Sequence, residues 1–118
     1  MRILVATEDA GLREVIQAAL ERMDYETEAV DNGFTASERI RNYFLDFVIA
    51  DVELPGVAGH ELAYEAKDLA HPPFVIVMGR REDVPQRFWE YIDYILPKPF
   101  GVPELAAAIE TATKRVVA

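Results

Sequence analysis

Short, continuous apolar runs constrain the fold of this chain more than any other feature of its sequence. They occupy residues 3–6, 47–50, 74–78 and 94–96. Runs of this kind are typical of strands that lie in a parallel sheet and are covered by helices on both faces. A further segment, residues 26–30, is half polar, which favours a place at an edge of the sheet.

Helical patterns fill the intervals between these strands. Helices are expected after Asp9, over residues 34–44, after Gly59 and around Pro103. In the second of these helices, Tyr43 and Phe44 are expected to face the core. Residues 80–89 are rich in charge and contain a proline, so we expect one or two helical turns there, or a loop.

The resulting order, β-α-β-α-β-α-β-(α)-β-α, predicts an α/β fold. We expect a doubly wound, five-stranded parallel sheet with helices on both faces and a shortened or irregular fourth helix. The chain has 118 residues, enough for one domain with its own core, so residues 1–118 are expected to form a single domain. Ligands of such sheets bind at the carboxyl ends of the strands.

Charge and composition exclude several classes of partner and site. The formal net charge is −9, which argues against nucleic acid as a direct partner and is compatible with a protein partner, a bound cation or simple solubility. There is no cysteine, so disulfides and thiolate metal sites are excluded. No apolar run is long enough for a membrane span, and the short apolar start ends in Glu8 and Asp9. We therefore expect a cytoplasmic protein without membrane contact.

Polar side chains follow the first, third and fifth strands: Thr7, Glu8 and Asp9, then Asp51, then Lys98. A single acid after a strand is usually a helix cap, but here the three strand ends share one edge of the sheet. Glu8 and Asp51 would repel each other unless a cation lay between them, and Mg²⁺ suits two carboxylates with waters and a phosphate. Lys98 would contact phosphate oxygens. This set fits phosphoryl transfer to Asp51.

Residues 3–9, the Asp-x-x-Leu-Pro-x-x-x-Gly stretch at 51–59 and the Lys-Pro-Phe sequence at 98–100 resemble the motifs of response-regulator receiver domains of two-component systems. The resemblance covers the whole chain. It implies the strand order 2-1-3-4-5.

The resemblance also implies roles for individual residues. Asp51 would be the phosphoacceptor, and Lys98 would contact the phosphoryl group. Mg²⁺ would be held by Glu8, Asp51 and the backbone carbonyl of Glu53. The peptide bond between Lys98 and Pro99 would be cis.

By the same resemblance, the domain would take its phosphoryl group from a histidine kinase or a histidine phosphotransfer protein. It would catalyse only its own phosphorylation and dephosphorylation, and so would not be an enzyme with a separate substrate. We expect no output domain after the last helix, so a downstream protein partner would carry the signal, or the domain would drain phosphate from a phosphorelay. Pro73, Phe74 and Gly79 also resemble the Pro-Phe-x-Phe-Ala-Thr-Gly-Tyr motif of single-domain receivers associated with HWE-type histidine kinases.

The chain departs from the family pattern at three positions. Thr7 stands where the first acid of a pair is usual, and Met78 stands where a Ser or Thr hydroxyl would bond the phosphoryl group, which a thioether cannot do. Ile95 holds the usual aromatic switch position, while Tyr94 beside it should point to the other face. These departures support an alternative, a degenerate receiver that acts as a phosphorylation-independent interaction module. A phosphatase or flavodoxin-like redox protein is disfavoured, because no phosphate-binding loop follows the first strand.

Other conspicuous residues leave two interpretations open. Phe88, Trp89 and Tyr91 lie near several arginines, and they either cap the core under a loop or form a patch for a partner. Glu53 and Arg80 are expected either to pair over the phosphoryl site or to leave Arg80 solvated at a loop edge.

The two histidines, His60 and His71, lack the spacing of metal ligands, so surface positions are expected for them.

Overall fold

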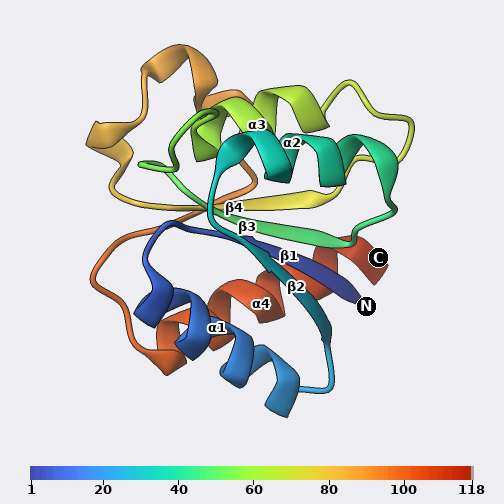
Figure 1. Ribbon diagram of the computed structural model, residues 1–118, viewed down its shortest axis with the longest axis vertical. Helices are drawn as coiled ribbons and strands as arrows, with labels where there is room; N and C mark the ends of the chain where they lie inside the picture. The colour runs from blue at the N-terminus through green and yellow to red at the C-terminus, as the bar shows by residue number, and fades with distance from the viewer. Residues whose placement is uncertain (118) are drawn as a thin grey trace.

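The computed structural model describes residues 1–117 and places a parallel sheet between two layers of helices (Figure 1). The sheet formed by these residues has five strands in the order β2-β1-β3-β4-β5, and every neighbouring pair is parallel. The strands are β1 (Arg2–Ala6), β2 (Glu26–Val30), β3 (Phe47–Asp51), β4 (Phe74–Met78) and β5 (Tyr94–Leu96). The predicted fold class, the strand order and the edge position of β2 are confirmed.

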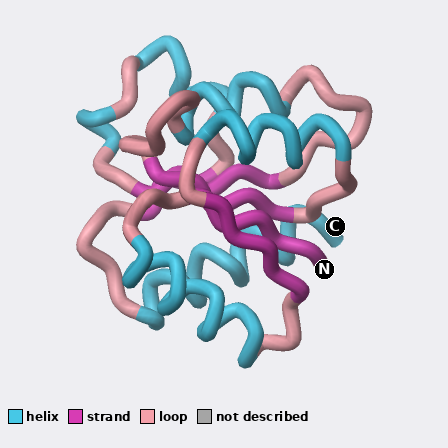
Figure 2. The backbone as a smooth tube through the Cα atoms, viewed as in Figure 1, coloured by secondary structure: helices cyan, strands magenta, loops and turns pink. Residues whose placement is uncertain are grey.

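Within the described residues, two α-helices cover each face of the sheet. They are α1 (Ala10–Arg22), α2 (Gly33–Asn42), α3 (Gly59–Ala66) and α4 (Val102–Val117). In Figure 1, α2 and α3 lie above the sheet and α1 and α4 below it, and Figure 2 shows the strands in magenta between these layers. No helix within residues 1–117 combines the length and the apolar character that crossing a bilayer requires.

The fourth helical segment of the predicted order is two short 3-10 helices, η1 (Arg81–Asp83) and η2 (Gln86–Tyr91). Pro85 lies between them as the N-cap of η2, so the interruption expected from the sequence is confirmed. The segment is held by local contacts: the indole N–H of Trp89 donates a hydrogen bond to the carbonyl of Val84 at 3.0 Å.

The core consists of two clusters, one on each face of the sheet. Alternate residues of the central strands contribute to opposite clusters, as the pleat requires. Ile3, Val5, Ile49 and Ile76 pack under α1 and α4, whereas Leu4, Val48 and Val75 pack under α2 and α3. All of these side chains are fully buried, so the ends of β1 and β3 are fixed by packing on both faces.

The end of α2 differs from the prediction. The helix stops at Asn42, and Tyr43 is extended at φ −131° and ψ 149°. Tyr43 and Phe44 are therefore exposed, at 50% and 66%, and the expectation that they face the core is wrong. Leu45, which is buried, fills the core position beside β3 instead.

Candidate functional site

The candidate site lies at the carboxyl edge of the sheet, where β1, β3 and β5 end. Asp51 is the last residue of β3, and Thr7 follows β1 directly. Because Ala6 pairs with Ala50 in the parallel register, Thr7 and Asp51 are the next residues along two neighbouring strands. Lys98 reaches the same point from the chain after β5. Three residues that the sequence singled out are thus brought together.

Both oxygens of the Asp51 carboxylate accept hydrogen bonds. The hydroxyl of Thr7 donates to Oδ2 at 3.0 Å, and the ammonium of Lys98 donates to the same oxygen at 2.7 Å. The backbone N–H of Glu53 donates to Oδ1 at 3.0 Å. Asp51 is only 5% exposed, and these donors offset the cost of keeping a carboxylate away from water.

Thr7 is held in place by three further hydrogen bonds, one of which runs from its backbone N–H to the carbonyl of Val30 at 3.1 Å. Its hydroxyl oxygen accepts from the backbone N–H of Asp9 at 3.2 Å, and its carbonyl accepts from the guanidinium of Arg13 at 2.9 Å. The role of Arg13 was missed from the sequence, where the only signal was an arginine in the second turn of the first helix. Thr7 is fully buried. At this position the chain therefore presents a neutral hydroxyl donor to Asp51, where the resemblance implies a carboxylate.

The loops around Asp51 owe their geometry to the residues of the sequence motifs. A Cβ atom on Gly59 would lie 2.6 Å from the carbonyl oxygen of Asp51, so only glycine lets α3 begin so close to β3. The bond between Lys98 and Pro99 is cis, as the resemblance implied. Glu8 and Asp9 are both exposed, and Asp9 caps α1 by accepting from the backbone N–H of Leu12 at 3.0 Å, so Glu8 is the acid without a capping role.

The donor set at the rim fits a hard cation with few protein ligands. Glu8 follows Thr7 directly, Glu53 lies two residues after Asp51, and both are exposed. The candidate ligands are therefore the carboxylates of Glu8 and Asp51 and the backbone carbonyl of Glu53. Within residues 1–117 no group of three or more His, Cys, Asp or Glu side chains is placed to hold a metal. Mg²⁺ commonly uses one or two carboxylates and keeps several waters, so the residues present fit this ion.

Met78 and Ile95 lie where the sequence placed them, and neither offers a polar group to the site. Met78 pairs with Asp51 in the register of β3 and β4, but its side chain is fully buried in the cluster under α1 and α4. Tyr94 packs against that cluster together with Leu96, so Ile95 between them points to the opposite face. The predicted orientation of Tyr94 is therefore confirmed.

A pocket of about 380 Å³ is lined by Lys98, whose ammonium contacts Asp51, and by Glu53 and Arg80. The ion pair expected between them is not formed. The Nε atom of Arg80 instead lies 3.8 Å from Asp83, three residues along the chain, and the Arg80 side chain is 67% exposed. The first turn of η1 thus offers a nearer carboxylate than the loop after β3, and the alternative of a solvated Arg80 describes the structure better.

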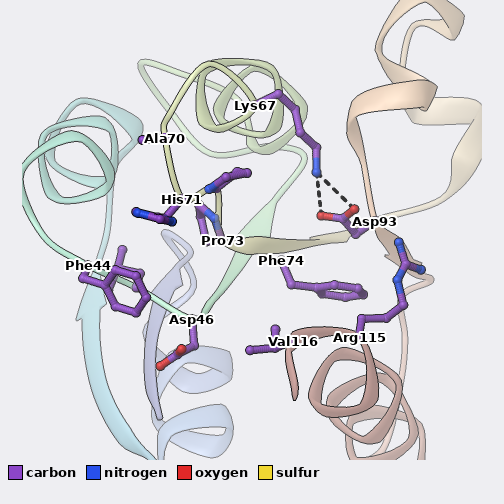
Figure 3. Close-up of a pocket in the computed structure, with 12 residues that line it drawn as sticks. Phe44, Asp46, Lys67, Ala70, His71, Pro73, Phe74, Asp93, Arg115 and Val116 are labelled. Carbon is purple, nitrogen blue, oxygen red and sulfur yellow. Dashed lines mark hydrogen bonds and ion pairs between the residues drawn. The ribbon is translucent and has the colours of Figure 1, made fainter. Parts of the chain in front are cut away.

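A second pocket of about 380 Å³ lies at the other end of the sheet, where β3 and β4 begin (Figure 3). Its charged groups are engaged with their own neighbours. Lys67 donates to both oxygens of Asp93, at 2.9 and 3.1 Å, and Asp93 also accepts from the backbone N–H of Val75. The guanidinium of Arg115 lies over the ring of Phe74 at 5.5 Å. These contacts tie α3, α4 and the start of β4 together, which is a structural role.

The two histidines differ in exposure. His71 is exposed near Phe44, as expected. His60 lies half-buried against Phe88, with ring centroids 4.8 Å apart, and its Nδ1 atom is buried without a hydrogen-bond partner among the described residues. The surface position expected for His60 is therefore wrong, because the Phe88 ring of η2 packs against it.

The comparisons with known proteins match this chain to response regulators. Residues 3–110 match the model of the response regulator receiver domain family. The response regulator MprA of Mycobacterium sp. (strain KMS) is 30% identical over 118 residues, which cover 98% of this chain and 51% of that protein. A CpxR homolog of Haemophilus influenzae, named as a transcriptional regulatory protein, is 28% identical over 97% of this chain and 51% of its own length. The chain thus spans about half the length of these relatives.

Solved structures show the same fold. The response regulator TrrA of Thermotoga maritima, solved in complex with Mg²⁺ and BeF, superposes with a TM-score of 0.84 at 26% identity, covering 94% of this chain and 97% of that one. The receiver domain of a sensor histidine kinase from Pseudomonas aeruginosa, with magnesium in its active site cleft, has a TM-score of 0.82 at 20% identity over 99% and 98% of the two chains.

Proposed function

This chain belongs to the response regulator receiver domain family, and from that premise we propose that it accepts a phosphoryl group on Asp51 from a phosphohistidine donor. The donor would be a histidine kinase or a histidine phosphotransfer protein. The domain would act on itself and not on a separate substrate, and it would pass the signal to a protein partner. The observation that carries this proposal is the buried Asp51 carboxylate held by Lys98 and Thr7.

The geometry supports in-line attack by this carboxylate. A lone pair of an Asp51 oxygen forms the new O–P bond while the N–P bond of the phosphohistidine breaks, and the imidazole leaves with the bonding pair. Lys98 already lies 2.7 Å from Oδ2, so its ammonium can follow the negative charge onto the phosphoryl oxygens. Mg²⁺, held by Glu8, Asp51 and the Glu53 carbonyl, would neutralise further charge on those oxygens.

The direct test is intact mass spectrometry after incubation with acetyl phosphate and Mg²⁺. Wild type should gain the mass of one phosphoryl group, and the Asp51→Asn variant should gain none. Asp9→Asn is a matched control, because Asp9 caps α1 at the same edge of the sheet and asparagine also caps helices well. Labelling that persists in Asp51→Asn, or that is lost in Asp9→Asn alone, would contradict the assignment of Asp51.

The alternative of a degenerate receiver predicts no mass gain in wild type with any phosphodonor. The family match does not favour it, although Thr7 and Met78 remain its motivation. The link to HWE-type kinases rests on three residues of one motif and stays a prediction from the sequence, as does the cytoplasmic location.

A further inference from the structure

A groove between α3 and η2 carries features that phosphorylation of Asp51 does not use. Its volume is about 630 Å³, larger than the pocket beside the acceptor. Three aromatic rings form its apolar lining. Tyr64 meets Tyr91 edge to face, with centroids 4.9 Å apart, and meets Phe88 in the same manner at 6.2 Å. Tyr64 is 49% exposed, so a large aromatic side chain is offered to a partner.

Carboxylates surround these rings. Glu61 and Glu65 come from α3 and Glu90 comes from η2, whereas Arg87 is the one cation among the lining residues. The negative charge of Glu90 also acts on the Tyr91 ring. It is the largest cause that raises the pKa of the Tyr91 phenol, and burial is the second. A negatively charged partner is therefore repelled, and a neutral one would cover these carboxylates without supplying a counter-charge.

The structure already contains the type of contact that this surface favours. The guanidinium of Arg87 lies 4.9 Å from the centroid of the Phe88 ring, and that of Arg81 lies 4.9 Å from the Trp89 ring. Cations are attracted to aromatic faces by the ring quadrupole, and arginine makes this contact more often than lysine. The rings of Tyr64 and Tyr91, bordered by acids, offer the same attraction to a cation from another chain.

We propose that the α3–η2 groove is a docking site for an arginine-bearing segment of a protein partner. The guanidinium would lie against Tyr64 and Tyr91, and apolar side chains next to it would fill the aromatic floor. Charge complementarity selects this occupant over an acidic or nucleic-acid partner. The proposal does not depend on Asp51, so it is tested with the unphosphorylated chain.

The test uses two short capped peptides of alanine and leucine, one with arginine at two positions and one with citrulline there. Citrulline keeps the shape of arginine but is neutral. The ring protons of Tyr64 and Tyr91 are followed by NMR during titration of the full chain. We expect the arginine peptide to shift these signals and to bind at least about fivefold more tightly than the citrulline peptide.

Two double variants distinguish binding at the α3–η2 groove from attraction by the overall negative charge of the protein. Glu61→Gln combined with Glu90→Gln should remove most of the preference for arginine, and glutamine can keep the contact that Glu61 makes with the backbone N–H of Ala58. Glu14→Gln combined with Glu110→Gln changes the net charge equally, on α1 and α4, and should leave the preference unchanged. Equal binding of the two peptides, unshifted tyrosine signals, or equal losses in the two double variants would each overturn the proposal.

Discussion

At the scale of single residues, Thr7 changes the electrostatics of the acceptor site most. Its hydroxyl donates to Asp51 where an acid would add charge, so two carboxylates, Glu8 and Asp51, remain for a cation. Thr7→Asp should therefore raise the affinity for Mg²⁺ by at least about tenfold, because a third carboxylate would face the ion. Calorimetric titration measures this. The same variant should melt at a lower temperature without Mg²⁺, because two buried carboxylates would then repel each other.

Thr7→Val is the matched control for this experiment. Valine keeps the shape of threonine and replaces the hydroxyl with a methyl group. It should cost about 2 kcal/mol of folding stability, because the hydrogen bonds of the hydroxyl with Asp51 and with the backbone N–H of Asp9 are lost. It adds no ligand, so its Mg²⁺ affinity should stay close to that of wild type. If Thr7→Asp binds Mg²⁺ no better than Thr7→Val, the cation does not lie near residue 7.

His60 gives the protein a predicted dependence of stability on pH. Burial lowers the pKa of its imidazole, and Arg87 acts in the same direction while Glu61 opposes it. As the pH falls below about 6.5, His60 takes up a proton in the unfolded chain before it does so in the folded chain. The free energy of unfolding is therefore highest above that pH and decreases below it. The melting temperature of wild type should fall more than that of His60→Gln between about pH 7.5 and pH 5.5. An equal fall in both proteins would show that His60 titrates alike when folded and unfolded.

The convergence of Thr7, Asp51 and Lys98 was predictable from the sequence, whereas the ion-pair partner of Arg80 was not. Thr7, Asp51 and Lys98 are placed by strand ends, and a parallel register brings strand ends together whatever the loops do. Arg80 sits in a loop where a carboxylate three residues away, on Asp83, competes with one across the pocket. The sequence does not show which carboxylate Arg80 will contact, because the conformation of the loop sets its distances to Asp83 and to Glu53.

At the scale of elements, the start of α2 is locked to the loop that follows Asp51. The backbone N–H of Gly33 donates to the carbonyl of Pro55 at 2.7 Å, and a Cβ atom on Gly33 would lie 2.0 Å from the carbonyl oxygen of Val57. Gly33→Ala must therefore push α2 away from this loop. We expect a loss of about 2–3 kcal/mol in urea unfolding and slower labelling of Asp51 by acetyl phosphate.

Gly11→Ala provides the comparison, because it makes the same chemical change in a helix without a close neighbour. A Cβ atom there would lie 3.5 Å from Oδ1 of Asp9, an ordinary contact. This variant should be as stable as wild type or more stable by about 0.5 kcal/mol, since alanine favours the helix. If both variants unfold at the same urea concentration, the contact between α2 and the acceptor loop contributes nothing.

Element boundaries show where the sequence is a weaker guide. The strands were predictable because continuous apolar runs require cover on both faces, and the interrupted η1–η2 segment was predictable from Pro85. The end of α2 was not, because Tyr43, Phe44 and Leu45 are all apolar and only one can enter the core after the chain leaves the helix. Helical spacing predicted that Tyr43 and Phe44 enter the core. The chain is instead extended at Tyr43, and this places Leu45 in the core.

At the scale of the whole molecule, the layered core separates the acceptor site from the distant helix faces. Asp51 is joined to the chain after β5 by Lys98, and the other route to β5 runs through the side chains of β4. In this chain Met78 is packed in the cluster under α1 and α4, and it cannot donate a hydrogen bond to a phosphoryl group. Ile95 has no ring to rotate between an inward and an outward position. We therefore expect little of an activation signal to pass from β4 to β5.

The consequence is a local response to activation, which beryllofluoride can test as a mimic of the phosphoryl group. A ligand shifts a conformational equilibrium only by its differential contacts with the two states, and here those contacts involve Thr7, Lys98 and the loops after β3 and β4. Backbone amide shifts should be large near Asp51 and Gly79 and small along β5 and α4. The Asp51→Asn variant with beryllofluoride and Mg²⁺ gives the baseline for these amide shifts. Met78→Thr introduces a hydroxyl at the cost of core packing, and it should extend the amide shifts toward Ile95. Large changes across β5 and α4 in wild type would show that another route carries the signal.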